Sequence, residues 1–187
     1  GDMKGLVRYL KSNPGKLGYG TWGMGSTGHL SMEALKAKEG LNISHVPYKT
    51  MGQVLTDLQG GTLQIAFVDA SSPLALIKAG KLVPLGVTGS QRLPALAGVP
   101  TMQEQGYRLG ADGWYGLFAP VGTPQAVVQR LNSEVNRILA APDMRPVLEA
   151  WNLSRFPIKT PAEFAQTIRE DLEQWKEIAT TAHVTLE

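Results

Sequence analysis

Short apolar segments alternate with helix-forming segments along the first hundred residues of this chain. The segments that read as strands are residues 17–21, 43–48, 63–68 and 82–88. The segments between them carry the start and stop residues of helices, and they are residues 30–38, 51–60 and 73–79. Because strands that alternate with helices pair in the same direction, this pattern predicts a parallel or mixed α/β sheet.

Polar residues placed to cap helices mark most of the expected helix starts. Asp2 precedes a first helix that is expected to run to about Leu10. Ser72 is expected to cap the helix that Pro73 begins. A capping box, in which a serine or threonine is followed three residues later by glutamate or glutamine, starts at Thr50, Thr101 and Thr160. These signals place the helices independently of the apolar pattern.

The character of the sequence changes near residue 111. Beyond it, only residues 113–119 and 156–158 read as strands. Helices are expected over residues 124–139, after Pro142, and over residues 160–181. Residues 112–187 therefore have too few strands for a sheet of their own. The sequence predicts two units, 1–111 and 112–187, of which the second is incomplete.

Charge and composition exclude several classes of protein. The 18 basic and 16 acidic residues leave a net charge of +2, which favours neither nucleic acid nor an anionic membrane as a partner. The chain of 187 residues has no cysteine, so disulfides, thiolate metal sites and cysteine nucleophiles are excluded. The three histidines, His29, His45 and His183, lack metal-ligand spacing, and neither a metal nor a cofactor is expected. No apolar run approaches the ~18 residues of a membrane span.

A glycine-rich loop joins the first expected strand to the next helix. Gly23-Met24-Gly25-Ser26-Thr27-Gly28 satisfies the dinucleotide-binding pattern G-x-G-x-x-G. It also follows an expected strand and precedes an expected helix, as the pattern requires. The acidic residue that a dinucleotide site needs about 20 positions later is absent, because His45 and the residues after it stand there. Hydroxyl groups and free N–H groups at a helix start suit a carboxylate instead. A turn with a purely structural role also remains open.

A second polar loop follows the neighbouring apolar strand. Asp69-Ala70-Ser71 comes directly after residues 63–68 and leads into a helix. Ligands of open α/β sheets bind at the carboxyl ends of the strands, so the two loops are expected to converge on one pocket. Asp69 is expected to accept a hydrogen bond from a hydroxyl, an amino group or a water, or to be an ordinary turn residue.

Catalysis is not expected from these residues. Ser26, His29 and Asp69 could be imagined as a nucleophilic triad, but the G-x-S-x-G elbow that presents such a serine is missing. His29 lies in the first turn of the helix after the glycine loop. Its expected role is a hydrogen bond that orders the loop, with direct ligand contact as the alternative.

A series of short segments matches one known family, in order, over essentially all of the chain. The series includes His45-Val46-Pro47-Tyr48-Lys49 and Trp114-Tyr115-Gly116-Leu117. The other matching segments are residues 13–20, 25–27, 29–30, 55–58, 60–61, 77–82, 92–96, 99–101, 119–120 and 122–124. Through these segments the chain resembles the Bug-type periplasmic solute receptors, which are the substrate-binding proteins of tripartite tricarboxylate transporters.

The resemblance implies a lobe of the type II periplasmic-binding-protein fold and an incomplete part of a second lobe. It implies a periplasmic receptor, without catalysis, that closes on a small carboxylate such as a di- or tricarboxylate, an amino acid or an aromatic acid. Transporter subunits in the membrane would be its partners. The ligand contacts would come from Trp22, Gly23, Gly25, Ser26, Thr27, Asp69, Ala70 and Ser71. An NAD(P)-binding oxidoreductase fragment is the alternative.

Receptors of this kind are about half as long again as this chain. They begin with a secretory signal and a strand–loop–helix segment, and the sequence that starts at Gly1-Asp2-Met3-Lys4 has neither. It is therefore expected to be an N-terminally truncated form, whether by engineering, proteolysis or natural shortening. An incomplete lobe exposes an apolar face, so a homo-oligomer that covers this face is expected.

Overall fold

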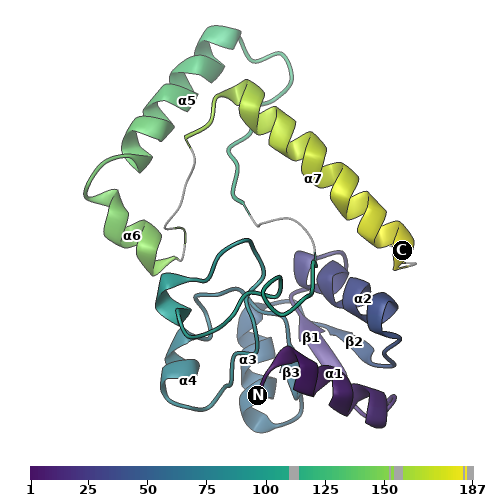
Figure 1. The fold of residues 1–187 in the computed structure, drawn as a ribbon. Helices are drawn as coiled ribbons and strands as arrows, with labels where there is room; N and C mark the ends of the chain where they lie inside the picture. The colour runs from purple at the N-terminus through teal and green to yellow at the C-terminus, as the bar shows by residue number, and fades with distance from the viewer. Residues whose placement is uncertain (110–113, 152, 154–157, 183, 185–187) are drawn as a thin grey trace.

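The computed structural model describes residues 1–109, 114–151, 153, 158–182 and 184. An α/β unit comes first, and a helical region follows it (Figure 1). In chain order the elements are α1 (Met3–Ser12), β1 (Gly18–Thr21), α2 (Thr27–Glu39), β2 (Ser44–Pro47), α3 (Met51–Gly60), β3 (Ile65–Ala66), α4 (Leu74–Lys78), the 3-10 helix η1 (Pro94–Leu96), α5 (Gln125–Leu139), α6 (Met144–Ala150) and α7 (Pro161–Thr181).

The sheet is parallel and has the order β2-β1-β3. Tyr19 of β1 pairs with His45 of β2 on one side and with Ile65 of β3 on the other. The central position of β1 places the loop that follows it next to the loop that follows β3. The predicted parallel α/β sheet is thus confirmed. The strand order places both loops at the carboxyl edge of the sheet, and their convergence on one pocket stays a prediction.

Helices cover both faces of the sheet. Successive residues of a strand point to opposite faces, so Tyr19 faces α2 and Gly20 faces α3. A Cβ atom at Gly20 would meet Cδ2 of Leu63, so the glycine lets Leu63 pack close to β1. The core between α1, α2, the sheet and the chain near residues 102–109 is formed by Met3, Val7, Leu10, Tyr19, Met32, Leu35, Leu41, Ile43, Met102, Tyr107 and Leu109.

Most of the predicted helix starts are confirmed by the cap geometry. Asp2 accepts a hydrogen bond of 2.7 Å from the amide of Gly5. Thr160 and Glu163 form the reciprocal capping box at the start of α7. The helix after the glycine loop begins at Thr27, three residues earlier than expected. Ser72 does not cap α4, because its hydroxyl donates to Asp69 instead.

The strand predicted over residues 82–88 is wrong. In residues 82–88 only Val87 pairs, through a single parallel bridge to Thr101. The carbonyl of Leu85 accepts a hydrogen bond from the side chain of Gln105, where a strand would receive a neighbouring backbone amide. The capping box at Thr101 forms, yet the chain turns at Gly106 (φ 92°) and builds no helix.

The aromatic segment after residue 113 is also not a strand. Trp114, Gly116 and Phe118 lie against Phe164 of α7. The ring of Trp114 meets Phe164 edge-on at 5.1 Å, and its N–H donates to Asp171. The predicted boundary between residues 111 and 112 lies outside the described residues, as do Gly113, Phe156 and Pro157. Ile158, the end of the last predicted strand, is described and is not in a strand.

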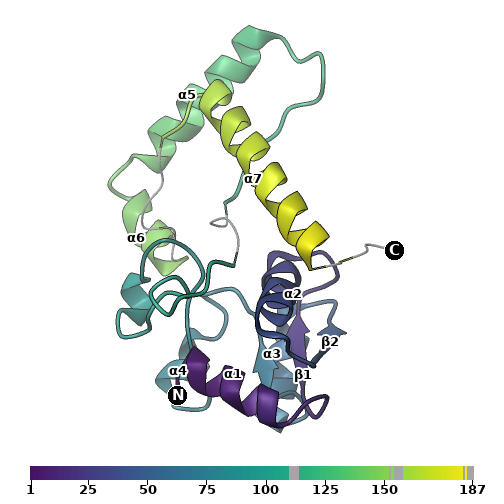
Figure 2. The ribbon, with the colours of Figure 1, turned by 45° about the vertical axis from the view of Figure 1, so that its right-hand side comes forward.

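The helices α5, α6 and α7 stand beyond one end of the α/β unit (Figures 1 and 2). The chain rises from the sheet to α5 and returns along α7, whose C-terminal end reaches α2. The side-chain amides of Asn132 and Asn136 in α5 both donate to the backbone carbonyl of Lys159, just before α7. No helix among the described residues is long and apolar enough to cross a membrane.

Candidate functional site

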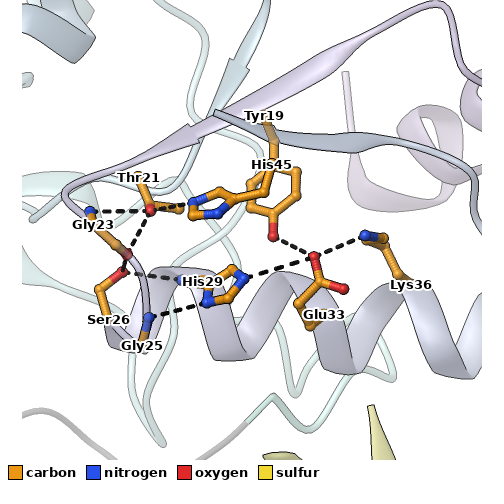
Figure 3. A network of polar contacts seen from close by, with 9 residues as sticks. All are labelled: Tyr19, Thr21, Gly23, Gly25, Ser26, His29, Glu33, Lys36 and His45. Atoms are coloured by element: carbon orange, nitrogen blue, oxygen red, sulfur yellow. Dashed lines mark hydrogen bonds and ion pairs between the residues drawn. The ribbon is translucent and has the colours of Figure 1, made fainter. Parts of the chain in front are cut away.

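The loop between β1 and α2 has a backbone that requires glycine at two positions. Gly23 has φ 135° and Gly25 has φ 70°, conformations that residues with a side chain rarely adopt. The hydroxyl of Thr21 donates to the carbonyl of Gly23 at 3.1 Å and accepts from its amide at 3.3 Å. The end of β1 therefore fixes the start of the loop (Figure 3).

Ser26 joins the loop to α2. Its hydroxyl accepts from the amide of His29 at 3.2 Å, as an N-cap does, and donates to the carbonyl of Gly23 at 2.8 Å. Both hydrogen bonds remain within the loop. Ser26, one of the predicted ligand contacts, is thus a residue that orders the loop in this structure.

The start of α2 meets the end of β3 at Gly28. A Cβ atom there would lie 2.7 Å from Cβ of Phe67 and 3.0 Å from the Trp22 ring, so the missing side chain allows the chains to meet. Phe67 directly follows β3, and Trp22 directly follows β1. Trp22 is 37% exposed, so part of its ring lies at the surface beside the loop.

Asp69 organises the second loop. One carboxylate oxygen accepts from the amides of Ser71 and Ser72 and from the hydroxyl of Ser71, and the other accepts from the hydroxyl of Ser72. Burial alone would raise the pKa of Asp69, but these hydrogen bonds outweigh it and hold the pKa below its usual value. Asp69 therefore carries a negative charge at neutral pH.

Hydrogen-bond donors remain at the N-terminus of α2. Among the described residues, no acceptor is bonded to the amides of Met24, Thr27 and Gly28. By contrast, the amides of Gly23, Gly25 and Ser26 are used within the loop or by the side chain of His29. The N-terminus of a helix also carries a partial positive charge. Met24 and Thr27 are exposed, so this end of α2 offers donors and a positive field to an anion.

A buried polar network lies behind the loop, between the sheet and α2 (Figure 3). The amide of Gly25 donates to Nδ1 of His29 at 3.1 Å, which confirms the predicted loop-ordering role of this histidine. The rings of His29 and His45 stack with their centres 4.1 Å apart. Nε2 of His45 in β2 lies 2.7 Å from the hydroxyl of Thr21 in β1, which is itself bonded to Gly23. Side chains from both strands are therefore connected to the loop.

Glu33 is the charged centre of the network. It accepts from the hydroxyl of Tyr19 at 2.5 Å and from Nζ of Lys36 at 2.8 Å, and it lies 4.0 Å from Nε2 of His29. Burial and then the Glu33 carboxylate raise the pKa of Tyr19, which stays protonated. Burial lowers the pKa of His29, a shift that Glu33 opposes and Lys36 reinforces. Burial and the neighbouring His29 lower the pKa of His45 to about 4.

Tyr19, Thr21, His45 and Glu33 were not identified from the sequence as parts of the site. One signal was available, since His29 and Glu33 are four residues apart on a helix and therefore share a face. The residues of β1 and β2 become neighbours only through the register of the sheet, which pairs Tyr19 with His45.

Other surface features do not point to a second centre. One open hollow lies along α7 and is lined mainly by charged and polar side chains such as Glu173 and Glu177. Another lies between α1 and Leu85. In the part of the chain that the structure describes, no three His, Cys, Asp or Glu side chains are grouped so that they could hold a metal ion.

Comparisons with known proteins identify the family. Residues 1–183 match the tripartite tricarboxylate transporter family receptor, TctC. A UPF0065 protein of Bordetella pertussis is 40% identical over 159 residues, which are 82% of this chain and 49% of that protein. The chain thus spans about half the length of this relative.

Solved structures agree with the family match. A structure described as a periplasmic transporter has a TM-score of 0.88 and 35% identity, and the match covers all of this chain and 62% of that one. The R. palustris protein Rpa4515, solved with adipate, has a TM-score of 0.85 and 32% identity over 98% of this chain and 62% of its own. These matches confirm the predicted periplasmic-binding-protein fold. They support a transporter receptor and not the oxidoreductase alternative. The chain belongs to the tripartite tricarboxylate transporter receptor family.

Proposed function

We propose that this chain forms one lobe, and part of the other, of a periplasmic receptor that binds a small carboxylate for a tripartite tricarboxylate-type transporter, without catalysis. In this proposal residues 1–111 form the ligand-binding lobe, and residues 112–187 are the returning part of the other lobe. Subunits of the membrane transporter would receive the ligand. The proposal rests on the family match together with the site at the edge of the sheet.

The observation that carries the proposal is the set of unused amides at the N-terminus of α2. A carboxylate needs several N–H donors, and the amides of Met24 and Thr27 are available beside the partial positive charge of the helix. The proposed ligand contacts are those expected from the sequence: Trp22, Gly23, Gly25, Ser26, Thr27, Asp69, Ala70 and Ser71.

Ser26 and Asp69 have distinct roles in this proposal. Ser26 keeps the loop in the shape that presents its amides. Asp69 is charged and would repel a carboxylate in direct contact, so it binds a hydroxyl, an amino group or a bridging water of the ligand. A ligand that carries such a group beside its carboxylate should therefore bind better than a simple acid.

A thermal-shift panel tests the proposed function. Adipate, malate, citrate, glutamate and benzoate are added to the chain, and at least one is expected to raise the melting temperature by several degrees. A ligand present at 100 times its Kd stabilises the folded state by about 2.7 kcal/mol. The double variant Ser26→Ala/Asp69→Ala should lose this rise. Thr56→Ala, on the exposed surface of α3, is the matched control and should keep it. A flat response to every acid would contradict the proposal.

We also infer that two copies of the chain associate through the helical region. Val127, Leu131 and Ile138 form an exposed apolar stripe along α5, at spacings of four and seven residues. Further large apolar side chains are exposed on neighbouring segments, at Tyr115, Leu117, Phe118, Val147, Trp151 and Leu172. Trp151 at the end of α6 is 63% exposed. A second copy would remove this surface from water.

Light scattering after gel filtration tests the association. We expect a mass of twice the 20.2 kDa chain. Leu131→Lys places a charge in the apolar stripe and should shift the mass to that of one chain. Gln129→Lys adds the same charge to another face of α5, because residues two apart on a helix point in different directions. This control should leave the mass unchanged. A monomeric wild-type chain would refute the inference.

A further inference from the structure

The amide of Gly25 and the ring of His29 form a hydrogen bond whose direction is fixed by its chemistry. A backbone N–H can only donate, so Nδ1 of His29 accepts and carries no proton. In the neutral ring the proton then resides on Nε2, which faces Glu33. We propose that His29 is the positioning residue of the loop 23–26 and holds it only while Nδ1 is unprotonated.

His29 holds the loop at two points. Its side chain binds the amide of Gly25, and its own amide binds the hydroxyl of Ser26. Ser26 in turn donates to the carbonyl of Gly23. These three bonds set the direction of the amides of Met24 and Thr27, which the proposed function assigns to the ligand. The inference therefore rests on the proposed function for its consequence but not for its geometry.

The surroundings of His29 hold its ring in one orientation. The residue is 4% exposed and stacks on His45 with an angle of 18° between the rings. Its Nε2 faces Glu33, which Tyr19 and Lys36 fix from β1 and from the next turn of α2. A ring held in this way cannot turn to present its other nitrogen to Gly25.

Protonation of Nδ1 would place an N–H group against the N–H group of Gly25. The titratable and charged groups that face His29 are Glu33 and Lys36 of α2, Tyr19 of β1 and His45 of β2. Burial and Lys36 oppose the charged ring and outweigh Glu33, so the pKa of His29 lies below its ordinary value. Nδ1 is therefore unprotonated at neutral pH and accepts the hydrogen bond from Gly25. The loop is released only in acid.

Hydrogen exchange of the Gly25 amide, followed by NMR on ¹⁵N-labelled protein, tests the inference. At pH 7.5 we expect this amide to exchange about tenfold more slowly than its intrinsic rate, which is the effect of one ordinary hydrogen bond. The protection factor, which corrects for the pH dependence of the chemistry itself, should fall towards one as His29 becomes protonated. An unprotected Gly25 amide at pH 7.5, or a protection factor independent of pH, would overturn the inference.

Two substitutions separate positioning from general stability. His29→Asn places an amide oxygen near the position of Nδ1 that does not titrate, so Gly25 should stay protected at both acidic and neutral pH. His29→Phe keeps a ring against His45 but removes the acceptor, so protection should be lost even at pH 7.5. Wild-type protection in His29→Phe would refute the inference. If that variant does not fold, the ¹⁵N chemical shifts of the His29 ring in the wild type decide the question. Shifts that show a protonated Nδ1 at pH 7.5 would refute the inference.

A ligand titration distinguishes this inference from the proposed function. Adipate is titrated into the wild type, His29→Asn and His29→Phe at pH 7.5. We expect a Kd about tenfold weaker for His29→Phe than for the other two, the effect of one ordinary hydrogen bond. Equal affinities in all three would refute the positioning role. If no protein binds adipate or the other acids of the panel, the proposed function fails, while the protection of Gly25 still decides whether His29 holds the loop.

Discussion

Replacing Tyr19 by alanine is expected to lower the free energy of unfolding by about 3–5 kcal/mol, as other aromatic-to-alanine changes in protein cores do. Tyr19 is completely buried at the centre of the sheet, between α2 and the ring of His45. The change leaves a cavity and also removes the hydroxyl that donates to Glu33. Urea unfolding followed by circular dichroism measures the loss.

Tyr19→Phe is the matched control, because it keeps the ring and removes only the hydroxyl. We expect this variant to lose about 1 kcal/mol, the usual net value of a hydrogen bond, since Lys36 still binds Glu33. The converse change, Glu33→Ala, strands the buried hydroxyl without an acceptor and should cost about 1–3 kcal/mol. A loss below about 1 kcal/mol for Tyr19→Ala would show that this network is not part of the stabilising core.

Helix ends were predictable because their signals are local. The Asp2 cap and the Thr160 capping box use residues within one helical turn, so the sequence pattern contains both partners of each bond. The strand β1 and the glycine loop were predictable for a similar reason, since Gly23 and Gly25 adopt backbone conformations that other residues avoid.

The wrong strands show where local patterns lose to distant contacts. The segment 82–88 is apolar enough for a strand, but Gln105 binds the carbonyl of Leu85 and also accepts from the amide of Met3. The aromatic residues after 113 have the composition of a strand, but Trp114 binds Asp171, which is 57 residues away. In both segments, side chains from elsewhere in the chain take the place of a neighbouring strand.

The candidate site also has a part that the sequence predicts and a part that it does not. The two loops were predicted, because each follows a strand and each contains turn residues. The network behind them was not, because His45 reaches His29 and Thr21 only through the pairing of β1 with β2. Sheet register depends on the whole hydrophobic pattern and is not contained in any short motif.

The pH dependence of stability is the second large effect that we expect. The pKa of His45 is lowered to about 4 by burial and by His29, whereas an unfolded histidine titrates near pH 6.5. Below pH 6.5 the unfolded chain binds a proton that the folded chain does not. The free energy of unfolding must therefore fall as the pH drops from about 6.5 towards 4, and level off below that.

The expected loss from His45 is about 1–2 kcal/mol. One pKa unit corresponds to about 1.4 kcal/mol, and partial exposure of the ring to water screens some of the shift. His29 shifts in the same direction and adds to the loss. Carboxylates with lowered pKa values, such as Asp69, lose their contribution only as the pH falls below about 4, so the two effects occupy different windows.

Urea unfolding at pH 7.5, 6.0, 5.0 and 4.5 measures this loss. The double variant His29→Asn/His45→Gln removes both titrating rings and keeps polar atoms near Nδ1 of one ring and Nε2 of the other. Its stability should be nearly flat between pH 6.5 and 4.5, while that of the wild type declines. Parallel curves of unfolding free energy against pH for the two proteins would contradict this prediction, because they would mean that the histidines are protonated equally in the folded and unfolded states. His29 is only 4% exposed, and burial of this kind disfavours the protonated ring in the folded state.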